Sequence, residues 1–116
     1  MSHKKKQRKL IRDRLSWWRD TLGLGYWKID IKFVSYFINS GRCVATTLCN
    51  WKYQEAEITF SLSEIEIMDK EEIEKAVVHE LMHVFLSETA CTSPDHEDRV
   101  ASQLQKAFMW VKGAEK

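Results

Sequence analysis

The chain has few of the features that mark secreted, membrane-spanning or disulfide-stabilised proteins. Its three cysteines, Cys43, Cys49 and Cys91, are an odd number at no metal-ligand spacing, and this pattern predicts reduced thiols in a cytoplasmic protein. No apolar segment follows the charged N-terminus, so we expect no secretory signal. No apolar run approaches the length of a bilayer-spanning helix. We also find no repeat and no linker, and 116 residues fit one domain.

The net charge of +1 hides an uneven distribution of charge along the chain. The first 20 residues carry only two acidic side chains, Asp13 and Asp20, against eight basic ones: Lys4, Lys5, Lys6, Arg8, Lys9, Arg12, Arg14 and Arg19. Such a segment indicates either a solvated tail and outer helix face, or a contact with nucleic acid, an anionic membrane surface or an acidic partner. We therefore predict a weak nucleic-acid contact through residues 4–19, and a DNA-binding module that uses this basic N-terminal helix is an alternative function. We expect the protein to be a monomer.

The spacing of apolar residues predicts an α+β domain. Helical spacing occurs in three segments, residues 7–22, 69–87 and 94–111, and strand patterns occur in three others, residues 26–34, 42–51 and 56–62. The order α-β-β-β-α-α predicts a small antiparallel or mixed sheet of three strands with helices packed on it. We place this domain at residues 7–111, between a basic flexible arm (residues 1–6) and a flexible tail (residues 112–116).

Two local patterns mark where the last two helices begin. Asp69 and Glu72 have the spacing of a capping box, in which each side chain bonds the backbone N–H of the other residue. Ser93 followed by Pro94 combines a good N-cap with proline at the first helical position. Residues 89–93 before this cap are expected to form a loop.

The segment His79-Glu80-Leu81-Met82-His83 is the most informative part of the sequence. Two histidines four residues apart on a helix lie one turn above each other on the same face. Their rings can converge on one Zn2+ ion at Zn–N distances of about 2.0–2.1 Å. Glu80 lies beside them, where its carboxylate can accept a proton from a metal-bound water and pass it to a leaving amine. We therefore predict a zinc peptidase with Glu80 as catalytic base; the alternative is a helix with two surface histidines.

A catalytic zinc ion needs a third protein ligand and one open position. The candidates lie at the start of the last predicted helix: Asp95, His96, Glu97 and Asp98. Glu97 lies on the apolar face that should pack on the histidine-bearing helix, whereas Asp95 and Asp98 point further round. We predict Glu97 as the third ligand, with His96 as second choice. The alternative for Glu97 is that a first-turn carboxylate only stabilises the helix N-terminus through its dipole.

The run from Ala76 to Val84, followed by Glu97 to Leu104, resembles the small gluzincin-type metallopeptidases. These are single-domain proteins, often encoded by phages and prokaryotes and sometimes called minigluzincins. Parts of residues 45–60 also resemble the strands before the motif in that group, so that the likeness covers about residues 25–108. The resemblance implies a zincin-like fold with an active-site helix, a second helix carrying a glutamate ligand, and a strand edge along which an extended peptide or protein substrate lies.

The chain departs from two related patterns. Leu86 stands where metzincins have a glycine, and Thr89 stands where they have a third histidine, which excludes that group. In larger gluzincins, an acidic residue four positions after the glutamate ligand orients a zinc-bound histidine, but here that residue is Ala101. The sequence therefore does not identify the residue that orients the histidine rings. Glu72 shares a helix face with His79 and is a candidate, although we expect it to cap the helix.

Three further questions remain open at the level of the sequence. Tyr36 and Tyr53 are candidate donors to an oxyanion, although a tyrosine in a turn more often packs. SprT-like proteases combine this motif with DNA-bound protein substrates, and their third ligand is a histidine, which would be His96 in this chain. A zinc ribbon often follows in that group, and the absence of a CxxC pair here weakens this alternative. A third alternative is an inactive domain in which zinc only stabilises the fold.

Overall fold

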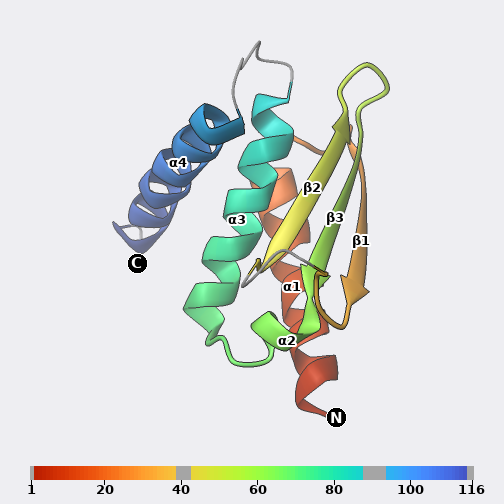
Figure 1. The fold of residues 1–116 in the computed structure, drawn as a ribbon. Coiled ribbons are helices and arrows are strands. Elements are labelled where there is room, and N and C mark those ends of the chain that lie inside the picture. The colour runs from red at the N-terminus through yellow and green to blue at the C-terminus, as the bar shows by residue number, and fades with distance from the viewer. Residues whose placement is uncertain (1, 39–42, 88–93, 115–116) are drawn as a thin grey trace.

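The computed structural model describes residues 2–38, 43–87 and 94–114. Within these residues three strands and four helices follow one another (Figure 1): α1 (His3–Thr21), β1 (Lys28–Val34), β2 (Ala45–Asn50), β3 (Glu55–Ser61), α2 (Leu62–Ile65), α3 (Lys70–Leu86) and α4 (Pro94–Ala114). The predicted α+β class and the three consecutive strands are confirmed. In the described part of the chain, no helix has both the length and the apolar character that crossing a bilayer requires.

The strands form one mixed sheet in the order β1-β3-β2. β1 runs parallel to β3, and β2 runs antiparallel to β3, so that Ile31 and Thr47 lie on either side of Ile58. The alternation of the sequence gives the sheet two faces: inward-facing residues are buried or half-buried, and most outward-facing ones are exposed. Because β2 is the last strand in this order, one of its backbone edges has no partner within the sheet.

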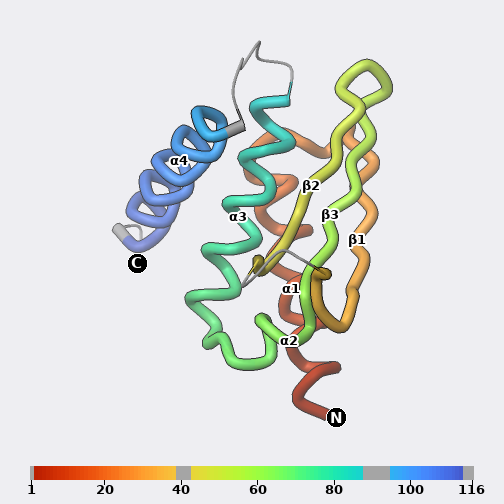
Figure 2. The backbone as a smooth tube through the Cα atoms, viewed as in Figure 1, coloured from red at the N-terminus to blue at the C-terminus, as the bar shows by residue number. Residues whose placement is uncertain are grey.

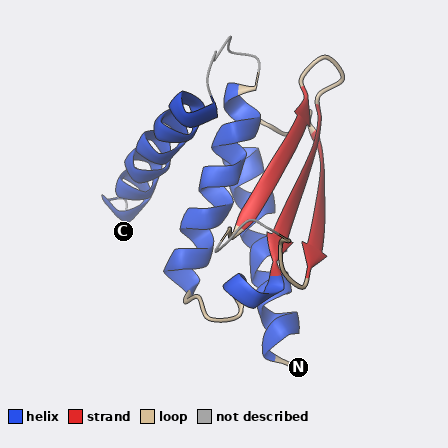
Figure 3. Ribbon diagram, viewed as in Figure 1, coloured by secondary structure: helices blue, strands red, loops and turns tan. Residues whose placement is uncertain are grey.

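Helices cover one face of the sheet. Figures 2 and 3 show α1 and α3 on that side and α4 beyond α3, so that α3 lies between the sheet and α4. α1 contributes one buried apolar stripe of Ile11, Leu15 and Trp18, at the spacing of a helix packed along one face. α3 contributes eight buried residues: Ile73, Val77, Val78, Glu80, Leu81, Met82, Val84 and Leu86. Burial around most of its circumference makes α3 the centre of the molecule.

Two helix ends lie several residues from their predicted positions, and one helix is additional. α1 begins at His3, so residues 3–6 of the expected arm are helical; buried Gln7 ties this end to the body by donating to the carbonyl oxygens of Ile65 at 2.7 Å and Met68 at 3.0 Å. α4 continues to Ala114, so residues 112–114 of the expected tail are also helical. α2 was not predicted, because a single turn of four residues is too short to show a helical period. The expected loop at residues 89–93, including the Ser93 cap, lies outside the described residues.

The predicted capping box at the start of α3 is confirmed. Oδ1 of Asp69 accepts a hydrogen bond from the backbone N–H of Glu72 at 2.8 Å, and Oε1 of Glu72 accepts one from the backbone N–H of Asp69 at 3.1 Å. Both bonds satisfy donors that an α-helix leaves without a partner at its N-terminus. The box therefore determines the residue at which α3 begins.

Replacing Asp69 by alanine should lower the free energy of unfolding by about 1 kcal/mol, because the cap is lost and the N–H of Glu72 is left to water. The measurement is chemical denaturation followed by circular dichroism. Asp69→Asn is the matched control, because asparagine caps about as well as aspartate. Equal loss in both variants would show that the carboxylate acts through its charge and not as a cap.

Candidate metal centre

The pitch of α3 directs the three motif side chains to two neighbours. His79 and His83 point toward α4, where each contacts a carboxylate of that helix. Glu80 lies about 100° further round the helix than His79, and it points toward the sheet, where it contacts Thr47. The two rings are half-buried, and Glu80 is only 7% exposed.

Three potential ligand atoms meet where α3 and α4 lie side by side. Nε2 of His79 lies 3.3 Å from Nε2 of His83 and 3.0 Å from Oδ1 of Asp98, and Nε2 of His83 lies 3.4 Å from the same oxygen. Atoms bound to a tetrahedral zinc ion at about 2.0–2.1 Å lie about 3.3–3.4 Å from one another. The triangle has nearly that size, so the group of His79, His83 and Asp98 could hold a metal ion.

The other nitrogen of each ring faces a partner on α4. Nδ1 of His83 lies 2.8 Å from Oε1 of Glu97, and Nδ1 of His79 lies 3.5 Å from Oγ of Ser102, the outer limit for a hydrogen bond. A ring whose Nε2 binds a cation carries its proton on Nδ1, and it then donates that proton to the carboxylate or hydroxyl beside it. Glu97 and Ser102 can therefore hold both rings in the tautomer that metal binding requires.

The structure corrects the helical-phase argument about Asp98. Helical phase predicts that Asp98 points further round α4 than Glu97, yet Asp98 belongs to the potential ligand group, whereas Glu97 lies on the Nδ1 side of His83. The reason lies in Ala101, which is 0% exposed and marks the line of contact with α3. At 3.6 residues per turn, Ala101 lies about 40° from Glu97 and about 60° from Asp98, so the two carboxylates flank that line. His96 is exposed and is outside the group; Glu97 as a direct ligand stays a prediction.

Thr47 contacts Glu80, the predicted base, and no motif in the sequence marks this residue. Its hydroxyl donates a hydrogen bond of 2.7 Å to Oε1 of Glu80. Alternation along β2 puts Ala45, Thr47 and Cys49 on the inner face of the edge strand. This alternation is the one sequence signal that could have shown that Thr47 faces the helices. What the alternation could not supply is the packing of β2 against α3. Among the contacts of the described residues, the hydrogen bond from Thr47 engages one oxygen of the Glu80 carboxylate, Oε1.

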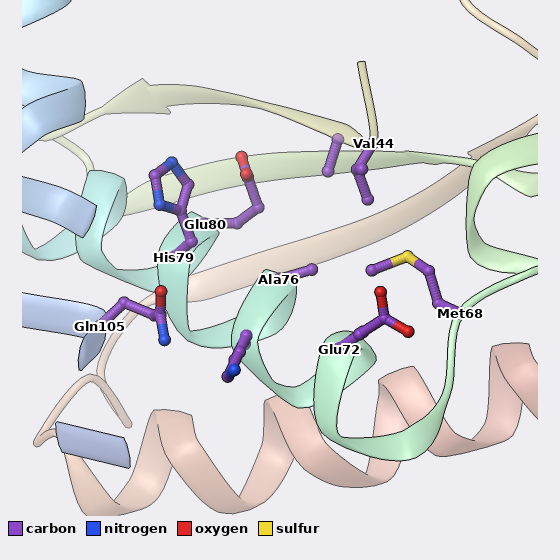
Figure 4. A pocket seen from close by; sticks show the side chains of 9 residues that line it. Val44, Met68, Glu72, Ala76, His79, Glu80 and Gln105 are labelled. Carbon is purple, nitrogen blue, oxygen red and sulfur yellow. The ribbon is translucent and has the colours of Figure 1, made fainter. Parts of the chain in front are cut away.

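A cavity of about 420 Å³ opens beside His79 and Glu80. Figure 4 shows these two side chains at one end and Glu72 and Met68 at the other, with Ala76 between them along α3. The remaining wall comes from Val44 and Ala45 at the start of β2, from Lys75 of α3 and from Gln105 of α4. The cavity therefore joins His79, one member of the potential ligand group, to Ala45 of the edge strand β2.

The described cysteines are not part of the ligand group. Cys43 and Cys49 are free, and Sγ of Cys43 donates to the carbonyl oxygen of Ala45 at 3.3 Å. Burial and the nearby negative charge of Glu97 raise the pKa of the Cys49 thiol to about 11, against a small opposing effect of a hydrogen bond with Ser87. A thiol with this pKa is protonated at neutral pH in the metal-free protein. Cys91 lies outside the described residues.

Two other groups of predicted residues do not reach the cavity. Tyr36 and Tyr53 are 66% and 74% exposed, and neither lines the cavity, so their role as oxyanion donors stays a prediction. The basic residues of α1 lie on a different element from the ligands. Two of them, Arg8 and Arg12, hold their guanidinium groups 5.8 and 5.1 Å from the centre of the Phe33 ring. The nucleic-acid contact through residues 4–19 also stays a prediction.

Comparisons of the chain with protein-family models, with curated proteins and with solved structures find no match. What is shown is a small α+β structure with a mixed three-stranded sheet, whose described helices bring two histidines and an aspartate close enough to hold a metal ion.

Metal affinity of single variants identifies the third ligand. Asp98→Ala should weaken zinc binding more than Glu97→Ala, because the first change removes a ligand atom and the second removes only the partner of His83, which costs about 10–100-fold in affinity. His96→Ala should bind zinc like the unchanged protein and serves as the control. The measurement is titration of the metal-free protein against a chromogenic chelator. The opposite order, with Glu97→Ala the weaker binder, would assign the ligand to Glu97.

Proposed function

We propose that the protein is a zinc-dependent peptidase that hydrolyses peptide bonds with a metal-activated water. The observation that carries the proposal is a ligand triangle of nearly tetrahedral size together with a buried carboxylate, Glu80, that lines one cavity with His79. A metal ion that only stabilised the fold would need the three ligand atoms but no buried carboxylate beside them. The carboxylate of Glu80 is not among the potential ligands. It lines the same cavity as His79, where a general base would act on a metal-bound water.

The roles of the residues follow from their contacts. When bound, zinc would lower the pKa of a coordinated water toward about 7 and polarise the carbonyl of the scissile bond. His79, His83 and Asp98 would hold the ion, while Glu97 and Ser102 keep the rings in the required tautomer. Oε1 of Glu80 accepts the hydrogen bond of Thr47. Its Oε2 would accept a proton from the water and deliver it to the amine of the departing peptide.

The free edge of β2 supports an extended peptide as the substrate. Backbone N–H and C=O groups of an unpaired strand edge bind a further strand through main-chain hydrogen bonds. Ala45, in this strand, lines the same cavity as Glu80. A peptide laid along β2 would therefore bring a backbone carbonyl to the ligand group and one side chain into the cavity, whose walls include Val44, Met68 and Ala76.

Replacing Glu80 by glutamine should lower the rate of peptide hydrolysis by about 10²–10⁴-fold, because the amide cannot accept the proton. Zinc binding should be retained, since Glu80 supplies no ligand atom. The measurement pairs a peptidase assay on the zinc-loaded protein with elemental analysis. Glu66→Gln is the matched control, because Glu66 is an exposed glutamate that lines no part of the cavity. Full activity in Glu80→Gln would exclude the proposed base, and no activity in the zinc-loaded native chain would favour a structural metal.

Replacing Thr47 by valine should lower kcat by roughly tenfold, because the valine keeps the shape of threonine but leaves Glu80 without the donor that orients it. The zinc dissociation constant should not change. Thr47→Ser retains the hydroxyl and should recover most of the rate. Steady-state kinetics of both variants test the point, and a Thr47→Val enzyme with unaltered kcat would show that Glu80 is oriented by other contacts.

A further inference from the structure

The C-terminal end of α4 is attached to the body of the protein by a cluster of polar and aromatic groups. The ammonium of Lys112 binds Oε2 of Glu74 on α3 and lies 4.9 and 5.7 Å from the ring centres of Trp17 and Trp18 on α1. Nε1 of Trp18 donates to the same carboxylate oxygen at 2.7 Å. The side chains of Lys112 and Glu74 are only 21% and 13% exposed. We call Trp17, Trp18, Glu74 and Lys112 the clasp.

The rest of the attachment of α4 is shallow. Among the described residues of α4 only Ala101 is fully buried, whereas Val100, Leu104, Phe108 and Met109 are partly buried against the core. Phe108 meets the edge of Trp18, with ring centres 6.4 Å apart, directly beside the clasp. Trp110, on the opposite face, is 79% exposed, and Val111, at the side of the helix, is 52% exposed. A half-buried helix gains little from apolar burial, so the charge-assisted contacts of the clasp form a large share of what holds it.

α4 carries both the lysine of the clasp and the three residues that contact the rings of His79 and His83. Asp98, Glu97 and Ser102 lie in its first half, and Lys112 follows Asp98 after 14 residues, a rise of about 21 Å. α3 and α4 run in opposite directions, since Asp98 meets His79 in the middle of α3 and Lys112 meets Glu74 nearer its start. A helix is stiff over this length, so contacts at one end constrain the position of the other.

We propose that the clasp positions the ligands of α4, so that Lys112 and Glu74 control metal affinity although neither belongs to the metal centre. The inference rests on the proposed function only for the use of the site. Metal binding needs α4 docked, and an apparent affinity falls in proportion to the fraction of molecules in the competent state. By linkage, a bound metal must in turn strengthen the docking of the clasp.

The charge state of Glu74 is consistent with this role. Burial by itself raises the pKa of Glu74, but the hydrogen bonds from Lys112 and Trp18, together with the charges of Lys112 and Arg14, lower it further than burial raises it. The folded pKa is thus below that of the unfolded chain. The contribution of the clasp is present above the unfolded value and is lost as the pH falls through the folded one. At neutral pH the carboxylate is ionised and the clasp is complete.

The test is zinc affinity in variants that leave the centre untouched. Lys112→Met keeps most of the side-chain stem but removes the charge and the donor, and Glu74→Gln removes the opposite charge. Each should raise the zinc dissociation constant by about tenfold or more. The double variant should be no weaker than the weaker single one, because both remove the same interaction. Lys112→Arg should bind zinc nearly as well as the native chain.

Lys106→Met is the matched control, since Lys106 is an exposed lysine of the same helix. It should change the dissociation constant by less than about twofold, because it lies outside the clasp. Dissociation constants of Lys112→Met and Glu74→Gln equal to that of the control would overturn the proposal.

A second measurement does not depend on the folding of any variant. Amide hydrogen exchange of the native chain with and without zinc reports the docking of α4 directly. Added zinc should slow the exchange of residues 108–112, far along the helix from Asp98. Unchanged exchange there would contradict the inference. A native chain that binds no zinc would refute the proposed function, whereas zinc binding that is insensitive to the clasp would refute this inference alone.

Discussion

The site depends on the rotation of α3 about its own axis. One turn every 3.6 residues puts His79 and His83 on the side of α4 and Glu80 on the side of β2. Burial fixes the orientation of α3 about its axis, because turning the helix would expose residues that are now in the core. Five of them are 0% exposed: Val77, Val78, Leu81, Met82 and Val84. The capping box at Asp69 and Glu72 locks the start of the same helix. The core packing of α3 therefore fixes the directions of His79, Glu80 and His83.

Two elements next to α3, β2 and α4, supply the side chains that contact its motif residues. The edge strand β2 supplies Thr47 to Glu80, the predicted base, and Ala45 to the cavity wall. α4 supplies Asp98 to the potential ligands, and Glu97 and Ser102 to the far nitrogens of the rings. The two contributions differ in how firmly they are held. β2 is hydrogen-bonded into the sheet, whereas α4 lies on the outside of α3 and has one fully buried residue among those described.

Most of the architecture could be predicted, because strong periodicity marks the elements that pack. The stripe of Ile11, Leu15 and Trp18 and the alternation of β1 each place one face in the core, and the structure confirms both. Boundaries were less accessible: α1 extends to His3 because Gln7 bonds carbonyls 58 and 61 residues away, contacts that no local pattern contains. α2 escaped because one turn shows no period.

The sequence by itself determined the local chemistry: a helix that carries two imidazoles one turn apart, with a carboxylate between them. Only the tertiary structure decided which side chains of other elements meet this helix. The choice between Asp98 and Glu97 depends on where the line of contact between two helices falls, and Ala101 puts that line between them. The contact of Thr47 with Glu80 depends likewise on how an edge strand packs on a helix. Helical and strand periods describe one element at a time, whereas a site formed by three elements depends on their relative rotation and distance.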